Sequence, residues 1–276
     1  MQIFGSGTET YLYLNGIATT RAIQLSDGVT LLPATCDPDP QTIIAMSKSE
    51  IDIGVAAIFL RSVRSQLHVV DTGPKELAIR AWNSIWDGIL LSAFFDCEAV
   101  CNFQCDTPAE AFGPKSQLDV TNYQLRGMSD EEPHMITDEE AAWLEKYFQN
   151  ASLLLKLDRF MDAANALSSY HWHVHPRVKL AILWAGVEGL FGIDSELAFR
   201  LSLYIARFLE PEDSAVRKKV FEDTKRLYKQ RSAAVHGAKI KGDTDASVQA
   251  SVDLLQRLIR RWVEKTALPD VENLAP

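Results

Sequence analysis

The sequence lacks the features of several large classes of protein. It contains only four cysteines, and its uninterrupted apolar runs, such as 55–60 and 89–91, are short. A membrane-spanning helix needs about 20 apolar residues in a row. The N-terminus has no basic segment followed by an apolar one, the pattern that is typical of a signal peptide. We therefore expect reduced thiols, a cytoplasmic location and no membrane partner.

Motifs of several common enzyme classes are also missing. The chain has no glycine-rich phosphate loop, no Gly-x-Ser-x-Gly sequence and no His-Glu-x-x-His sequence. Nucleotide hydrolysis and the chemistry of serine or zinc hydrolases therefore have no support in the sequence. We expect neither a cofactor nor a metal ion.

The composition is that of a globular protein with an uneven charge. The 276 residues are 47% hydrophobic and 24% charged, and they allow one large or two ordinary domains. A net charge of −9 argues against a protein that coats nucleic acid nonspecifically. However, residues 200–241 hold 11 lysines and arginines against 5 acidic residues, whereas the remainder holds 17 against 32. This basic segment is either a solvated helix face or a phosphate-facing groove on an acidic body.

Residues 1–135 have the pattern of a mixed α+β domain. Short apolar or β-branched runs predict strands near 10–14, 29–32, 67–70 and within 99–125, with turns at Asn15-Gly16 and Asp27-Gly28. Helical spacing of apolar residues predicts helices over 41–64 and 76–95.

The rest of the chain predicts a helical bundle over residues 136–268, followed by a tail at 269–276. Asp130-Glu-Glu-Pro133 marks the expected boundary, and Thr137 with Glu140 forms a capping box that starts a helix running to about Leu157. Further helices are expected over 158–168, 177–191, 197–208 and 248–262, with another that ends near His236. The overall fold class is therefore α+β.

The segment from Leu227 to Gly237 carries the residues of greatest interest. Arg231 continues the apolar stripe of its helix, so its guanidinium needs a partner. Gly237 is a candidate for the left-handed residue that follows a helix, which places His236 in the last turn. Five residues of helix separate Arg231 and His236 by about 140° around the axis. They can meet on one phosphate only if the helix ends between them or if a second copy supplies part of the site.

These residues resemble a known family. Arg231-Ser-Ala-Ala-Val-His236 fits the Arg-x4–6-His motif of HEPN domains. It follows Trp184-Ala-Gly-Val-Glu188-Gly-Leu-Phe191 and Ser195-Glu-Leu-Ala-Phe-Arg-Leu201 in the order seen in the Apea-like HEPN group. The resemblance covers about residues 137–265.

The resemblance implies a metal-independent endoribonuclease, often a toxin or a part of an antiviral or stress defence system, that acts as a homodimer on RNA. It implies that Arg231 and His236 are the catalytic residues, and that cleavage gives a 2′,3′-cyclic phosphate. We expect supporting roles for Glu188, Ser232 and Tyr228. Lysines that flank the motif are expected to bind RNA: Lys229, Lys239 and Lys241.

Two other interpretations stay open. In the first, the bundle is a noncatalytic dimeric binding module, and Arg231 pairs with an acid of the other subunit. In the second, residues 1–135 are a sensor that gates the bundle. An antitoxin or a phage-derived trigger is a further expected partner. Glu188 lies on an otherwise apolar helix, so it either orients Arg231 or His236 or pairs with another base of the bundle.

Two clusters of metal-ligand residue types have simpler explanations. Cys97, Cys101 and Cys105 span an expected change from helix to strand, so their thiols need not face one point, and we interpret them as packed free cysteines. The histidines of His171-Trp-His-Val-His175 precede Pro176 between two helices, so we interpret them as part of a connector.

Overall fold

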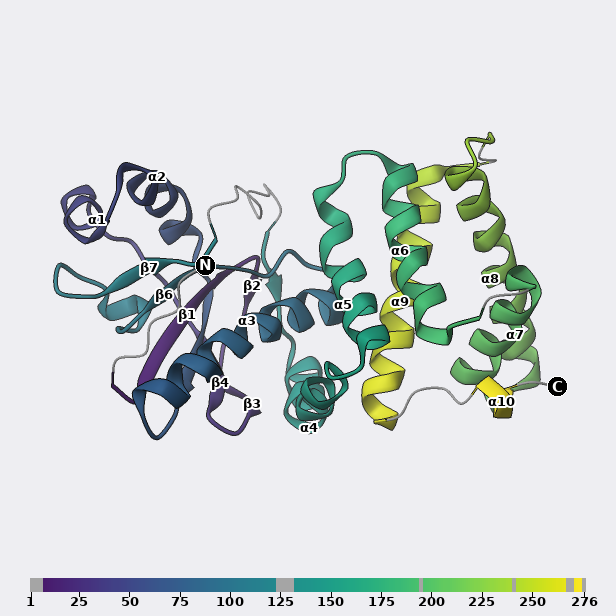
Figure 1. Ribbon diagram of the computed structural model, residues 1–276, viewed down its shortest axis with the longest axis horizontal. Helices are drawn as coiled ribbons and strands as arrows, with labels where there is room; N and C mark the ends of the chain where they lie inside the picture. The colour runs from purple at the N-terminus through teal and green to yellow at the C-terminus, as the bar shows by residue number, and fades with distance from the viewer. Residues whose placement is uncertain (1–6, 123–131, 194–195, 240–241, 267–270, 275–276) are drawn as a thin grey trace. The chain divides into compact units, whose positions relative to one another are not determined.

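The computed structural model describes residues 7–122, 132–193, 196–239, 242–266 and 271–274. Asp130 and Glu131 of the expected boundary lie outside these ranges. The fold is α+β, with an antiparallel sheet in the N-terminal part followed by a helical region, as the sequence predicts (Figure 1). The chain divides into two compact units: Met1–Ser92 with Cys97–Gln149, and Ala93–Asp96 with Asn150–Pro276.

A six-stranded sheet forms the centre of the first unit. Its strands are β1 (Glu9–Asn15), β3 (Ile23–Ser26), β4 (Val29–Pro33), β5 (Ser65–Val70), β6 (Val100–Cys105) and β7 (Leu118–Val120). Their order is β3-β4-β5-β1-β6-β7, and all neighbours are antiparallel. A separate parallel pair joins β2 (Ile17–Ala18) to β8 (His134–Met135). Gly16 and Gly28 both have positive φ, so they occupy the predicted turns.

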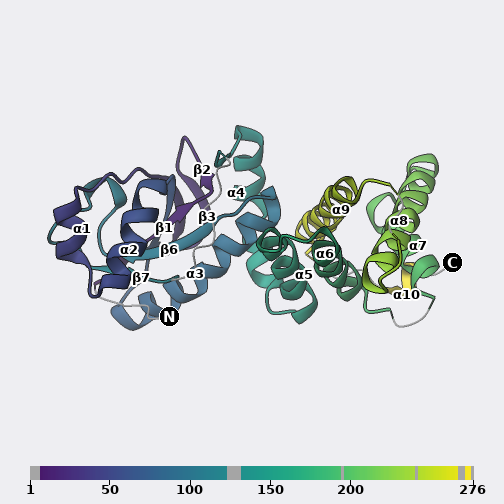
Figure 2. The ribbon, with the colours of Figure 1, turned by 90° about the horizontal axis from the view of Figure 1, so that it is seen from above.

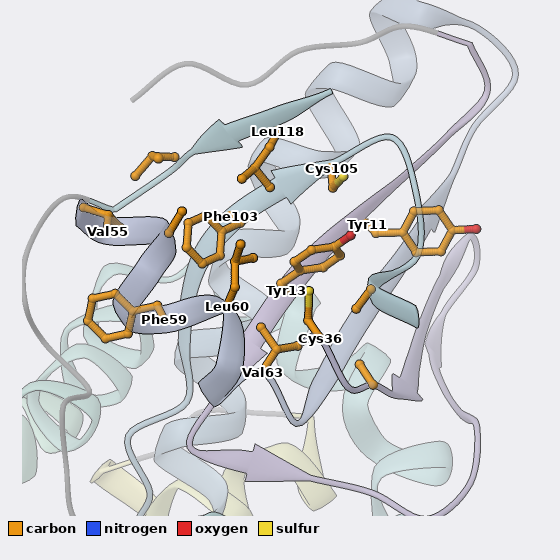
Figure 3. Packing of buried hydrophobic residues seen from close by; sticks show 14 of the residues in the cluster. Tyr11, Tyr13, Cys36, Val55, Phe59, Leu60, Val63, Phe103, Cys105 and Leu118 are labelled. Atoms are coloured by element: carbon orange, nitrogen blue, oxygen red, sulfur yellow. The ribbon is translucent and has the colours of Figure 1, made fainter. Parts of the chain in front are cut away.

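Helices cover both faces of this sheet. Tyr11 and Tyr13 of β1 pack with Ile43 of α1 (Pro40–Met46) and Phe59 of α2 (Glu50–Phe59) in a buried apolar cluster (Figure 3). On the other face, Leu14 lies beside Gly88 of α3 (Pro74–Phe95). Because β1 is covered on both sides, Thr10 to Asn15 are all buried and do not alternate with exposed residues.

The prediction of one helix over 41–64 is wrong, because the structure divides this segment into two helices, α1 and α2. Ser47 ends α1 with extended backbone, and its hydroxyl donates to the carbonyl of Ile43. Ser49 then caps α2 by accepting a hydrogen bond from the Asp52 N–H, and a 3₁₀ turn (Leu60–Ser62) follows. Serine side chains that satisfy the backbone at both ends make two short helices possible.

The second unit is a helical bundle around α6 (Pro176–Phe191). This helix packs against α5 (Asp158–Ser169), α8 (Ser214–Val235) and α9 (Thr244–Lys265) (Figures 1 and 2). α7 (Leu197–Leu209) packs on α8, α10 (Val271–Leu274) packs on α7, and a 3₁₀ turn (Tyr170–Trp172) joins α5 to α6. A Cβ on Gly186 would lie 2.9 Å from the Ala166 Cβ, so this glycine permits the close approach of α5 and α6.

The division between the units falls later than the boundary expected at residue 135. It lies after Gln149, inside α4 (Asp138–Leu154). The start of α4 is held by the predicted capping box, in which the Thr137 N–H donates to Glu140 and the Glu140 N–H donates to Thr137 Oγ1. Glu145 then accepts a hydrogen bond from Arg21 at 2.6 Å, which ties this half of α4 to the first unit.

Candidate functional site

The candidate site is built on the C-terminal half of α8. This helix begins at Asp213, whose carboxylate accepts hydrogen bonds from the Ala215 and Val216 N–H groups. It ends at Val235, and His236 is the capping residue, with its N–H bonded to the Ser232 carbonyl at 3.0 Å. Gly237 follows with φ +73°, so the prediction of a left-handed glycine after the helix is confirmed.

Arg231 finds its partner on α6. Its Nη2 donates to Glu188 Oε2 at 2.9 Å, and each of the two side chains is 19% exposed. Of the partners that the sequence allows for Glu188, which are Arg231, His236 or another base of the bundle, the structure gives it Arg231. The contact joins one oxygen to one nitrogen; Glu188 Oε1 and Arg231 Nε are buried with no hydrogen-bond partner among the described residues. This pair is less complete than the bidentate arrangement that arginine and carboxylate often adopt.

An aromatic pair, Tyr228 and Trp184, packs next to the Arg231 guanidinium. The Arg231 guanidinium lies 5.7 Å from the centroid of the Tyr228 ring, within the range of a cation–π contact. Tyr228 in turn meets Trp184 of α6 edge to face at 5.6 Å, and the Trp184 indole donates to Ser251 Oγ on α9. The half-buried Tyr228 ring therefore connects Arg231 to Trp184, which is buried in the core of the bundle.

Burial dominates the electrostatics of this cluster. It raises the pKa of Glu188 above its ordinary value, although the charge of Arg231 acts in the opposite direction. Burial, together with the negative charge of Glu188, also raises the pKa of Tyr228. The Tyr228 hydroxyl is therefore a proton donor at neutral pH, not a phenolate.

His236 and the other predicted residues lie around this pair with different exposure. His236 is exposed, and among the described residues its side chain makes no hydrogen bond or ion pair. Ser232 is half-buried, and Lys229 and Lys239 are exposed. Lys241 lies outside the described residues.

The structure also bears on how Arg231 and His236 can act together. α8 continues through Arg231 and ends at Val235, directly before the capping residue His236. The helix therefore ends between the two residues, as the first of the two conditions for their convergence requires. Arg231 turns towards α6, whereas His236 stands free at the end of α8.

Arg177 is part of this region and was missed by the sequence reasoning. It lies in the first turn of α6, and its guanidinium donates to the carbonyls of Ala233, Ala234 and Ala238 at 3.0, 3.3 and 2.7 Å. The chain around His236 is thus tied to α6. The only local signal is an arginine directly after Pro176 at the start of a helix, and this does not identify a partner about 60 residues away.

The histidines of the 171–175 segment form no common centre. His171 Nε2 lies 3.2 Å from Asp96 Oδ1, and the Tyr170 hydroxyl donates to the same oxygen at 2.6 Å. Burial opposes ionisation of Asp96, but these contacts hold its pKa below the ordinary value. His173 and His175 lie in the connector that leads into α6, as interpreted from the sequence.

The four cysteines are free thiols, and Cys101 and Cys105 lie in different surroundings. Cys105 packs in the apolar cluster of the first unit, whereas Cys101 Sγ lies 3.7 Å from Thr121 Oγ1. Burial raises the pKa of each of these two thiols to about 11. In the part of the chain that the structure describes, no group of three or more histidines, cysteines and acidic residues is arranged to hold a metal ion.

The described helices and the sequence give no membrane span and no match to known proteins. Among the described helices, none combines the length and apolar character that a bilayer crossing requires. Comparison with protein-family models, with curated proteins and with solved structures finds no match.

Proposed function

We propose that this protein is a metal-independent endoribonuclease of the HEPN type. The observation that carries the proposal is the Arg231–Glu188 pair, 19% exposed on each side, followed five residues later by an exposed histidine at a helix end. The pair holds a permanent cation at a defined place. The histidine is open to a ligand. Arg231 and His236 both lie in residues 200–241, which hold 11 lysines and arginines against 5 acidic residues, and this favours a phosphate-bearing substrate.

The chemistry of RNA fits these two side chains. RNA carries its own nucleophile, because the 2′-oxygen can attack the adjacent phosphorus while the 5′-oxygen leaves. The reaction needs a base for the 2′-OH proton, an acid for the leaving oxygen and a cation for the charge on the phosphorane. A histidine can serve as base or acid at neutral pH, and an arginine can bind phosphate oxygens. The products are a 2′,3′-cyclic phosphate and a 5′-OH.

A second copy of the chain completes the site in this proposal. One His236 cannot be base and acid in the same step, and Arg231 is turned towards α6 by its pair with Glu188. A two-fold dimer supplies two copies of each residue from identical chains. Lys229 and Lys239, both exposed, are then positioned to contact the RNA backbone. A role as a toxin or defence effector, restrained by an antitoxin or gated by a phage-derived trigger, belongs to the same proposal.

The competing function is a noncatalytic binding module. It is favoured by one observation: Arg231 is paired within its own chain, and not with an acid of the other subunit as the sequence interpretation expected, so its role can be to hold α6 to α8. In this case the motif stabilises the bundle, and the exposed His236 performs no chemistry.

Analysis of the reaction products separates the two functions. Purified protein is incubated with a mixed-sequence RNA and with the same sequence as DNA, which lacks the 2′-OH. The proposal predicts cleavage of the RNA alone, with cyclic phosphate at the 3′ ends and hydroxyl at the 5′ ends. Cleavage of the DNA, or 5′-phosphate ends on the RNA fragments, would exclude attack by the 2′-oxygen. A stable protein that cuts neither substrate would favour the binding module.

A further inference from the structure

Arg177 makes an unusual set of contacts at the end of α8. Its Nη1 donates to the carbonyl oxygens of Ala233 and Ala234, and its Nη2 donates to the carbonyl oxygen of Ala238 at 2.7 Å. The last four carbonyls of any helix lack an N–H partner within the helix. Ala233 and Ala234 are among these residues, whereas Ala238 lies beyond Gly237. One guanidinium therefore bridges the backbone before and after His236.

This bridge ties down the backbone that carries His236. The His236 side chain is exposed, and no side-chain hydrogen bond fixes it among the described residues. Three features hold the backbone turn that carries it: the N–H bond to Ser232, the left-handed Gly237 and the bridge from Arg177. Of these three, only Arg177 connects the turn to another helix, α6, which also carries Glu188. Arg177 thus links the position of His236 to α6, whose Glu188 pairs with Arg231.

We infer that Arg177 is a positioning residue for His236, acting through the backbone carbonyls on either side of it. The inference rests on the proposed function for its catalytic consequence, but its structural content can be measured separately. The planar guanidinium has five N–H donors in a fixed fork, which is why it can reach three carbonyls at once. A lysine keeps the positive charge near the end of α8 but cannot span both sides of the turn.

The chain offers a matched control at the other end of the same helix. Arg217, in the first turn of α8, donates from Nη1 to the carbonyls of Glu210 and Pro211 at 3.1 and 2.7 Å. Arg217 is half-buried and Arg177 is exposed, but both are arginines that bridge backbone carbonyls at an end of α8. Its loss should have a comparable effect on folding, but it lies far along the helix from His236.

The test compares Arg177→Ala and Arg177→Lys with Arg217→Ala. The first readout is the imidazole resonances of His236 in proton NMR, assigned by their loss in His236→Ala. We expect them to shift and broaden in both Arg177 variants and to stay unchanged in Arg217→Ala. The second readout is RNA cleavage: we expect kcat to fall about 10- to 100-fold in Arg177→Ala, with KM changed by less than about two-fold, because the histidine is misplaced and binding is kept.

The outcomes separate the inference from the proposed function. Unchanged His236 resonances in Arg177→Ala, or equal changes in Arg217→Ala, would overturn the inference. If the parent protein cuts no RNA, the proposed function fails, and the resonances still decide whether Arg177 positions His236. Should Arg177→Ala unfold at the assay temperature, Arg177→Lys provides the same comparison with the charge retained.

Discussion

The Glu188–Arg231 pair leads to a quantitative prediction about the free energy of unfolding. We consider the single replacements Glu188→Ala and Arg231→Ala and the double variant. Each single replacement leaves one charge in a site where both side chains are only 19% exposed. The double variant removes both charges together. The two single effects should therefore exceed the effect of the double variant when they are added.

The magnitude follows from the burial of the pair. Two unit charges about 4 Å apart attract by about 4 kcal/mol at an effective dielectric constant of about 20, but desolvation offsets much of this. The raised pKa of Glu188 also indicates that the cost of burying its charge outweighs the attraction of Arg231. Removing one partner costs about 0–1 kcal/mol at a surface and about 3–5 kcal/mol in a fully buried pair. For this intermediate site we expect about 2 kcal/mol for each single variant and a coupling of about 1–2 kcal/mol.

The assay is urea unfolding of the four proteins at pH 7, repeated in high salt. The pair is mostly shielded from solvent, so we expect the coupling to change little with ionic strength. Additive effects, with a coupling below about 0.3 kcal/mol, would refute the reasoning, because they would mean that the contact between α6 and α8 carries no energy of its own. A coupling that disappears in salt would place the pair at the surface.

Two further predictions concern backbone and burial. Gly237→Ala should destabilise the protein by about 1 kcal/mol, because the residue has φ +73°, which is unfavourable for alanine. An added Cβ there meets nothing within 4 Å, so the backbone conformation is the whole cause. In the control Gly189→Ala, inside α6 and equally unobstructed, thermal unfolding should show a stabilisation of about 0.5–1 kcal/mol. Burial raises the pKa of Asp87 on α3 from 3.8 to about 7, so between these pH values the folded chain keeps a proton that the unfolded chain has released, and stability falls as the pH rises. Asp87→Asn should therefore exceed the parent in stability by about 2–4 kcal/mol at pH 8 and match it near pH 4 in urea titrations; a constant difference across this range would show that the carboxyl does not titrate as stated.

Local chemistry explains which parts of the fold could be predicted from the sequence. The capping box depends on Thr137 and Glu140, three positions apart, and the glycine signal after α8 depends on Gly237 alone. Both were read correctly because the physical cause lies within one turn of helix. The partner of Glu188 was narrowed to a few candidates, since an acid on an apolar helix requires a base.

The features that escaped prediction depend on contacts between distant segments, or on polar side chains that compete with a helix for the backbone groups. Arg177 reaches carbonyls about 60 positions away, and nothing in its neighbourhood distinguishes it from a solvated arginine. The break between α1 and α2 arises because Ser47 and Ser49 satisfy the backbone, although apolar spacing continues through them. The first unit extends into α4, where Glu145 contacts Arg21, 124 residues away in the sequence.

The most direct test of the proposed nuclease is cleavage of mixed-sequence RNA in excess EDTA by the parent, by His236→Ala and by His175→Ala. His175 is a matched control, because it is an exposed histidine of the same unit. The account predicts full cleavage by the parent and by His175→Ala, and loss of cleavage in His236→Ala. Equal cleavage by all three proteins, or cleavage by the parent that EDTA abolishes, would contradict it.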